Sequence, residues 1–363
     1  MTLRYGLIGC GMMGQEHIRN IALLDGARIV ALADPDAGMI DAARHLAGTS
    51  CAVHADHRSM LYSGNLDAVI IAAPNHLHHP ILADVIPSGL PILCEKPLCT
   101  TRVDCASVRD LAHAHDTPVW VAMEYRYMAP IRRLIDIVHG GDAGRIRMLT
   151  IREHRYPFLS KVGDWNRFNA HTGGTLVEKC CHFFDLMRLI LASEPVRVYA
   201  SGAMDENHVG ERYDGRQPDI IDNAYVIVDF ASGSRAMLDL CMFAEGSYWQ
   251  EVISATGPRA RVDAMVPGPA RFWQDGSQER SAQVVIHDRA TQSETVEEAH
   301  EDHNILGAGD HHGSTYHQHV GFLQMVRDRG TPDVTLDDGL RAVAVGEAAE
   351  ISLRTQQPVD LEF

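Results

Sequence analysis

Three side chains suited to proton transfer follow a pair of glycines near the middle of the chain. Glu178, His182 and Asp185 come after Gly173-Gly174, in a stretch that we expect to be helical as far as Leu191. Residues three and four apart lie on one face of a helix, so these side chains are expected to point the same way. An unperturbed imidazole titrates near pH ~6.5, and His182 is therefore the candidate general base.

A plainer interpretation of each residue stays open. Thr175-x-x-Glu178 matches a capping box, in which Glu178 would bond back to the start of its own helix. A single histidine on an apolar helix is ordinarily a hydrogen-bonded core residue. Asp185 is expected to support or orient other groups rather than to react.

A second chemical signature lies at the start of the chain, where a short apolar run leads into Gly9-x-Gly11-x-x-Gly14 and then a helical pattern. Gly9 allows a tight turn, Gly11 lets the backbone approach a pyrophosphate, and Gly14 lets helix pack on strand. The helix N-terminus offers free N–H groups to phosphates. Asp34 ends the next strand, where a carboxylate can bond the ribose hydroxyls of NAD. The sequence therefore predicts an NAD site.

The elements that would hold these residues alternate through the first third of the chain. We expect strands at 28–33, 51–54, 66–73, 91–94 and 118–122, and helices at 15–24, 36–46, 80–88 and 103–115. This alternation predicts an α/β Rossmann domain with a doubly wound parallel sheet, whose ligands sit at the carboxyl ends of the strands.

Lys96 lies at such a strand end, between Glu95 and Pro97. Pro97 restricts the preceding residue to extended geometry, which aims the Lys96 ammonium at one place. The alternative is a solvated lysine in a loop. The segment 74–79 follows the preceding strand in the same way.

The rest of the chain predicts a different architecture. We expect a helix at 130–139, a strand at 145–156, hairpins at 223–243 and 250–265, and a strand at 281–287, with long loops at 205–219 and 288–314. Strands in succession favour an α+β domain with a large, mainly antiparallel, open sheet. We therefore divide the chain into residues 1–123, which bind NAD, and residues 124–363, which bind substrate and form subunit contacts.

The motifs together resemble one enzyme family, the Gfo/Idh/MocA oxidoreductases, which include glucose–fructose oxidoreductase and inositol dehydrogenases. The resemblance runs in order through Gly9 to Gly14, Asp34, Pro74-Asn75 with His78, Glu95-Lys96-Pro97, Arg126 with Pro130, the turn at 140–144, Gly173-Gly174 with His182 and Asp185, and the helix from Asp338-Gly339 to Ser352. In the family the acid four residues before the histidine is usually Asp, whereas this chain has Glu178.

The resemblance implies roles for particular residues. Catalysis would fall to Lys96, His182 and Glu178, with Lys96 at the substrate hydroxyl and the nicotinamide ribose. The cofactor would contact Gly9, Gly11, Met12, Met13, Gly14, Asp34, Ala73, Pro74, Asn75, His78, Glu95 and Lys96. Apart from the resemblance, Tyr125, Arg126, Trp165 and the loop that contains His311 are further candidates, although that loop is as readily interpreted as an ordinary polar loop. We therefore expect the substrate to contact Lys96, Tyr125, Arg126, Trp165, Glu178, His182 and His311.

Composition limits the partners. The formal net charge of −16 argues against nucleic acid or an anionic membrane. No apolar run is long enough to span a bilayer, and we expect no signal peptide, so a cytoplasmic protein is predicted. The eight scattered cysteines are interpreted as buried thiols. The histidine clusters lack zinc-site spacing, and no metal is expected.

The function predicted from these features is NAD-dependent oxidation of a secondary alcohol of a sugar or cyclic polyol, by a homodimer or homotetramer. Two alternatives remain. One is a glycoside-cleaving enzyme that oxidises transiently, eliminates and reduces again without net NAD turnover. The other is a non-catalytic cofactor-sensing regulator, although such a sensor would need neither Lys96 nor His182.

Overall fold

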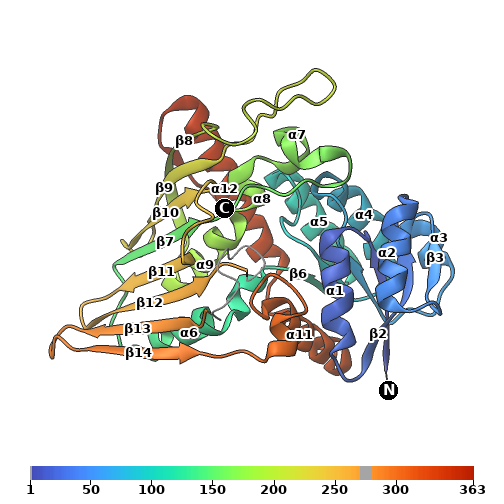
Figure 1. Cartoon of the computed structure of the whole chain (residues 1–363), viewed down its shortest axis with the longest axis horizontal. Helices are drawn as coiled ribbons and strands as arrows, with labels where there is room; N and C mark the ends of the chain where they lie inside the picture. The colour runs from blue at the N-terminus through green and yellow to red at the C-terminus, as the bar shows by residue number, and fades with distance from the viewer. Residues whose placement is uncertain (1, 270–279) are drawn as a thin grey trace.

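Two β-sheets lie side by side in the computed structural model, which describes residues 2–269 and 280–363 (Figure 1). The first sheet is parallel throughout, in the order β3-β2-β1-β4-β5-β6. Its strands are β1 (Leu3–Ile8), β2 (Ala27–Ala33), β3 (Ala52–His54), β4 (Ala68–Ile71), β5 (Ile92–Cys94) and β6 (Val119–Val121). This is the strand order of a dinucleotide-binding Rossmann domain.

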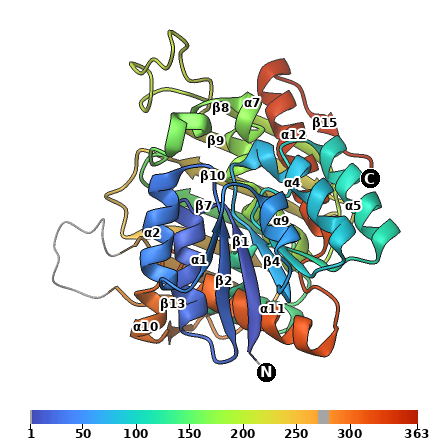
Figure 2. The same ribbon diagram turned by 90° about the vertical axis from the view of Figure 1, so that its right-hand side faces the viewer.

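Helices cover both faces of this sheet, and Figure 2 shows α1 and α2 on one side of the strands and α4 and α5 on the other. They are α1 (Met12–Ala22), α2 (Ala37–Ala47), α3 (His57–Tyr62), α4 (His78–Val85) and α5 (Arg102–His115), with short 3-10 turns η1 (Asn75–Leu77) and η2 (Ile86–Ser88). Every residue of β4 is buried, as expected of a parallel strand covered on both faces. The prediction of a doubly wound α/β domain is confirmed.

The second sheet has nine strands in the order β14-β13-β12-β11-β7-β10-β9-β8-β15. They are β7 (Met148–His154), β8 (Pro195–Ala203), β9 (Asn223–Phe230), β10 (Arg235–Cys241), β11 (Trp249–Thr256), β12 (Ala260–Pro267), β13 (Ala282–Asp288), β14 (Glu294–Ala299) and β15 (Val359–Asp360). Among the described strands of this sheet, β7 and β10 alone pair in parallel, so the sheet is mixed but mostly antiparallel, as predicted.

The remaining helical segments pack on one face of the second sheet or between the sheets. They are η3 (Glu124–Tyr127), α6 (Ala129–Gly140), η4 (Val162–Arg167), α7 (Asn169–Thr172), α8 (Thr175–Glu178), α9 (Cys181–Leu191), α10 (His303–Leu306), α11 (Ser314–Asp328) and α12 (Leu336–Thr355). Helices α6, α9 and α12 bury the inner face of the sheet. The outer face carries exposed apolar side chains at Met148, Tyr199, Tyr225 and Ile227.

Two expectations need correction. The stretch predicted as a loop at 288–314 contains β14, an edge strand whose polar composition hides it. The helix expected from the glycine pair to Leu191 is broken into α8 and α9. The first core also takes in α11 and the start of α12, through Phe322 and Leu340 among others. The division at residue 123 therefore stays a prediction, because this packing brings late residues to the first domain.

Candidate active site

Lys96 reaches from the first domain into the second. It follows β5, and its Nζ donates to the backbone carbonyl of Glu178 at 3.1 Å. A continuous helix would offer that carbonyl to the amide of His182, so the break between α8 and α9 coincides with the lysine contact. Burial alone would lower the pKa of Lys96, but Cys181 and Glu95 outweigh it and raise the pKa above 10.5. Lys96 is a cation at neutral pH.

His182 lies on α9 with its ring stacked on Tyr125, the two centroids 4.1 Å apart and the planes at 6°. The residue is 2% exposed, and its Nδ1 has no hydrogen-bond partner among the described residues. Burial, reinforced by the charges of Lys96 and Lys179, lowers the pKa of His182 well below 6.5. The imidazole is therefore neutral at neutral pH, which is the form that can accept a proton.

Glu178 does not cap its own helix. The N-cap of α8 is Gly174 and makes no side-chain cap, while the Thr175 hydroxyl bonds the backbone of Ile221. The carboxylate that bonds an N-terminal amide of α8 comes from α12, where Glu350 Oε1 accepts from Leu176 N at 3.0 Å. The capping-box interpretation of Glu178 is therefore wrong.

Instead, Glu178 faces a lysine that the sequence analysis left out of the site. Its Oε1 lies 3.7 Å from Lys161 Nζ, and its Oε2 is buried without a hydrogen-bond partner in the part of the chain that is described. The Lys161 ammonium lies 4.7 Å from the ring centroid of Trp165, which in turn approaches His76 of the first domain at 6.1 Å. The predicted residues Trp165 and Glu178 thus meet through Lys161.

Glu124 is a second site residue that sequence reasoning missed. It begins η3 shortly after β6, which ends at Val121, and its Oε1 lies 3.8 Å from His182 Nε2. Burial, together with the nearby Glu95, raises the pKa of Glu124 to about 7. Its position at the carboxyl end of a parallel strand was the available signal, because the same rule had been applied to β4 and β5.

Arg126 and Asp185 form a buried ion pair instead of lining the reacting centre. Arg126 Nε and Nη2 donate to the two oxygens of Asp185 at 2.6 and 2.5 Å, and Nη2 also lies 3.5 Å from Asp338. Asp185 supports the fold in this way, in line with the sequence analysis. The prediction that Arg126 binds substrate gains no support from these contacts.

His311 approaches the site as a cation. Its Nδ1 lies 2.7 Å from Glu16 Oε1 on α1, and its ring is 6.2 Å from that of Tyr125. Burial opposes the charge, but Glu16 outweighs it and raises the pKa of His311 to about 9. The pKa of Glu16 falls to about 2, because the attraction of His311 and His17 exceeds the effect of burial.

The glycine turn fits a dinucleotide. A Cβ on Gly14 would lie 2.1 Å from the carbonyl oxygen of Gly9, so helix and turn can meet only without side chains there. A Cβ on Gly11 would meet no atom within 4 Å, which leaves the approach to the backbone open. Helix α1 starts beyond Gly11 with no side-chain cap, so the amides of Met12 and Met13 remain available to phosphate.

Among the other residues predicted to bind the cofactor, some are placed to contact it and one holds neighbouring loops together. Asp34 is held at its strand end by the amides of Cys10 and Asp36, at 2.7 and 2.8 Å. Asn75 Nδ2 is buried without a hydrogen-bond partner among residues 2–269 and 280–363, as a donor reserved for a ligand would be. The ring nitrogens of His78 face the carbonyls of Ala73 and Pro97, at 2.9 and 2.8 Å. His78 therefore joins two cofactor loops and is not itself open to a ligand.

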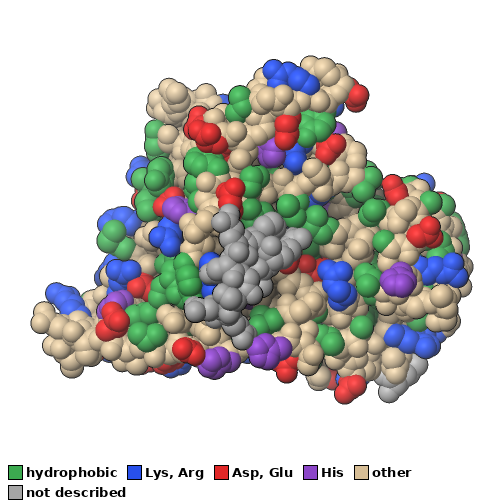
Figure 3. All heavy atoms as spheres, viewed as in Figure 1, with side chains coloured by type: hydrophobic (Ala, Val, Ile, Leu, Met, Phe, Trp, Pro, Cys, Tyr) green, Lys and Arg blue, Asp and Glu red, His purple; other side chains and the backbone are tan. Residues whose placement is uncertain are grey.

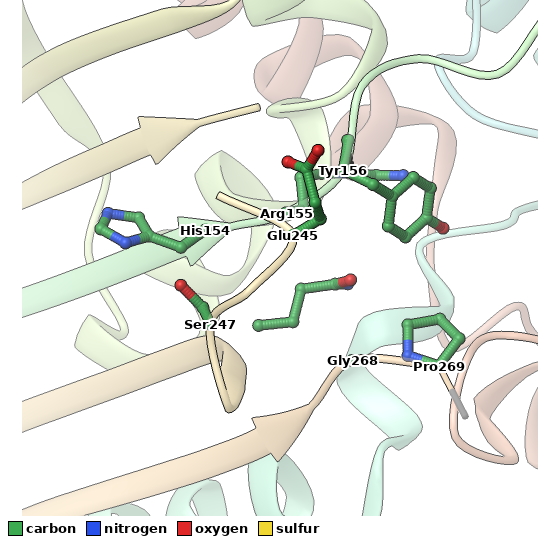
Figure 4. Close-up of a pocket in the computed structure, with 8 residues that line it drawn as sticks. His154, Arg155, Tyr156, Glu245, Ser247, Gly268 and Pro269 are labelled. Carbon is green, nitrogen blue, oxygen red and sulfur yellow. Dashed lines mark hydrogen bonds between the residues drawn. The ribbon is translucent and has the colours of Figure 1, made fainter. Parts of the chain in front are cut away.

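Other surface features lie outside this constellation. A recess is lined by residues at or just beyond the ends of β7 and β12 and at or before the start of β11 (Figure 4), and none of the residues described above lines it. Acidic and basic side chains are interspersed over the face drawn in Figure 3. Within the described residues, no group of three or more His, Cys, Asp or Glu could hold a metal ion. No helix in that part is long and apolar enough to cross a membrane.

The fold and the site define an NAD(P)-dependent oxidoreductase that acts on CH–OH donors. The model for an oxidoreductase family, NAD-binding Rossmann fold, matches residues 3–123, and that for an oxidoreductase family, C-terminal alpha/beta domain, matches residues 135–361. The chain belongs to the Gfo/Idh/MocA oxidoreductase family, and its N-terminal domain is an NAD-binding domain.

Similar proteins share this architecture at low identity. The rhizopine catabolism protein MocA of Rhizobium meliloti is 28% identical over 257 residues, which cover 70% of this chain and 76% of that protein. Inositol 2-dehydrogenase 1 of Saccharopolyspora erythraea is 29% identical over 268 residues, which cover 69% and 70%. The solved structure of levoglucosan dehydrogenase with NADH has a TM-score of 0.82 at 19% identity, over 100% of both chains, and shows the shared fold.

Proposed function

We propose that this chain is a dehydrogenase that oxidises a secondary alcohol of a sugar or cyclic polyol to a ketone or lactone with NAD. Family membership supports polyol or sugar oxidation in general, and relatives named for inositol and levoglucosan oxidation support the finer statement. The observation that carries the proposal is the Lys96 ammonium, which reaches across to the Glu178 carbonyl and whose charge helps to lower the pKa of the buried His182, so that this imidazole is neutral.

In this proposal His182, Lys96 and Glu178 have different functions at the substrate hydroxyls. Bound NAD supplies the hydride acceptor, at nicotinamide C4. His182 takes the hydroxyl proton as the C–H bond breaks, because its imidazole is neutral. Lys96 donates a hydrogen bond to the developing alkoxide and stabilises its negative charge. Glu178, with Lys161, holds a neighbouring hydroxyl of the substrate.

The substrate of this proposal is uncharged. Three cations near the site already have acidic partners: Arg126 pairs with Asp185, Lys161 with Glu178, and Arg167 with Glu211. A phosphate or carboxylate that bound one of these three cations would have to displace its carboxylate partner. Activity confined to phosphorylated or carboxylated sugars would contradict this part of the proposal.

A panel of inositols, aldoses and glycosides tests the reaction. With NAD added, net formation of NADH, followed by its absorbance, supports the dehydrogenase. Release of an aglycone with only catalytic NAD would favour the glycoside-cleaving alternative. Binding of NAD with no turnover of any member would favour the cofactor-sensing alternative.

The proposal includes a homodimer or homotetramer built on the outer face of the second sheet. Tyr199 pairs with Ile227 across β8 and β9, and Tyr225 and Met148 lie on the same exposed face. Covering these side chains would remove apolar surface from water. Light scattering that finds a monomer at micromolar concentration would contradict it. The cytoplasmic location remains a prediction.

A further inference from the structure

Glu124 is a buried carboxylate that the reaction above does not use. It is 1% exposed, and neither of its side-chain oxygens has a hydrogen-bond partner within the described residues. A buried ionisable group without partners costs free energy, so its retention requires a reason. Neighbouring Arg126, two residues along the same 3-10 turn, has its partners in full.

The group that Glu124 faces is the general base. Its Oε1 lies 3.8 Å from His182 Nε2, which is too long for a hydrogen bond but within reach of a small side-chain rotation. The other ring nitrogen, Nδ1, is enclosed and has no partner in the described part of the chain. Nε2 is therefore the nitrogen at which a proton arrives and from which it leaves.

Charges from several elements set the balance between the two groups. Glu124 faces Glu95 and Lys96 after β5, His311 before α11, and His182 on α9. His182 faces Lys96, Lys179, His311 and Arg155. The cations around His182 and its burial lower its pKa, whereas burial and Glu95 raise the pKa of Glu124 to about 7. Because the pKa of Glu124 is higher than that of His182, a proton that reaches either group binds to the Glu124 carboxyl in preference to the His182 imidazole.

We propose that Glu124 receives the substrate proton from His182. The step rests on the proposed dehydrogenation, in which the substrate O–H bond breaks and its proton moves to His182 Nε2 while the C–H electron pair leaves as hydride to NAD. The Nε2–H bond then breaks as an O–H bond forms at Glu124 Oε1. The proton passes to water as the product leaves, which restores the neutral imidazole and the carboxylate. Glu124 acts only through His182.

The first test replaces Glu124 by an isosteric amide. Glu124→Gln should lower kcat on a polyol probe, myo-inositol, by about tenfold or more, with little change in KM. It should also move the acid limb of the rate to lower pH, because the remaining limb belongs to His182 alone. The matched control is Glu251→Gln, since Glu251 is buried, has an unpaired oxygen among the described residues and a pKa of about 7, yet does not contact His182.

Two results of the kinetic test would overturn the proposal. One is an unchanged kcat and acid limb. The other is a loss of kcat with an unshifted limb and equally weakened NADH binding by fluorescence, which would make Glu124 a structural residue.

The second test needs no substrate, so it separates this proposal from the proposed function. Infrared difference spectra of the NADH complex across pH should show a carboxylic acid C=O stretch that titrates near neutrality. Glu124→Gln should remove one such band, and Glu251→Gln a different one. Should no polyol be oxidised, the proposed function fails while this band still supports a near-neutral proton site at Glu124. Spectra of wild type and Glu124→Gln that agree at every pH overturn it.

Discussion

Two buried pairs of charged or polar side chains share the same two elements, yet they are built differently. The turn η3 supplies Glu124 and Arg126, and α9 supplies His182 and Asp185. Arg126 and Asp185 meet through two hydrogen bonds of 2.6 and 2.5 Å. Glu124 and His182 stand 3.8 Å apart without one. One pair has its hydrogen bonds made, and the other keeps polar atoms without partners among the described residues.

The difference distinguishes a structural pair, Arg126 and Asp185, from a pair proposed to act in catalysis, Glu124 and His182. A buried ion pair with its hydrogen bonds satisfied contributes to a specific packing, because breaking it leaves an uncompensated charge. Buried polar atoms without partners are rare in proteins and often mark functional positions. Among the described residues such atoms include Glu124 Oε1, Glu178 Oε2, His182 Nδ1 and Asn75 Nδ2.

The largest expected effect is the loss of kcat when the imidazole of the Glu124–His182 pair is removed. His182→Ala should lower kcat by about 10²–10⁴, the usual contribution of a general base. NADH affinity should barely change, because His182 lies in the second domain. The wild-type rate should fall in acid as Glu124 and, at lower pH, His182 become protonated, and the variant should flatten that limb. A near-normal kcat with an unchanged pH profile would contradict the assignment of the base.

Removing the guanidinium tests the complete pair. Arg126→Leu leaves Asp185 buried and unpaired, and should destabilise the protein by about 3–5 kcal/mol. Urea unfolding of the two variants measures the contrast, since His182→Ala should retain most of its stability. The double variant Arg126→Leu, Asp185→Leu serves as control and should recover much of the loss. A large fall in kcat/KM with full stability would instead restore Arg126 as a substrate ligand.

The sequence predicted those parts of the site that depend on short-range patterns, that is, on residues close together in the chain. Gly9, Gly11 and Gly14 are recognisable because the turn needs residues without side chains at fixed spacing. Lys96 was predicted because a strand end and a proline fix its direction. The two-sheet architecture followed from the change of pattern near residue 124, from alternating strands and helices to successive strands.

The remainder depended on contacts between distant segments. Arg126 and Asp185 are 59 positions apart, and nothing local marks them as partners. The sequence offered Glu178 as a cap of α8, whereas the amide of Leu176 bonds Glu350, 174 residues away. The local sequence shows which side chains could accept a hydrogen bond from the first amides of α8. The packing of α12 against α8 determines that Glu350 is the one that does. The position of Glu124 after β6 could have been noticed, but its burial without a partner among the described residues is a property of the folded chain.

A smaller effect is expected at Glu178, which has one partnered and one unpartnered oxygen. Glu178→Gln removes the charge that faces Lys161 and should lower kcat/KM by about tenfold, or ~1.4 kcal/mol. Glu350→Ala is the matched control, because it removes the carboxylate that bonds the end of α8 and should reduce stability but leave the rate close to normal. Full activity of Glu178→Gln would show that this carboxylate does not act on the substrate.

The last expected effect is on stability and concerns Glu16 and His311, a pair that joins α1 to the loop before α11. The pKa of His311 is raised from 6.5 to about 9, so its stabilisation is complete below pH ~6.5 and is lost as pH rises through about 9. The pKa of Glu16 is lowered from 4.5 to about 2, so the same interaction is lost in acid as pH falls through that range. Stabilisation by this pair is therefore greatest between about pH 4.5 and 6.5.

His311→Gln should flatten the alkaline decline in unfolding free energy between pH 6.5 and 9, by about 1–3 kcal/mol. Urea midpoints at each pH measure it, with Glu16→Gln expected to give the same flattening, and an equally steep decline in both variants would assign the alkaline loss to other groups.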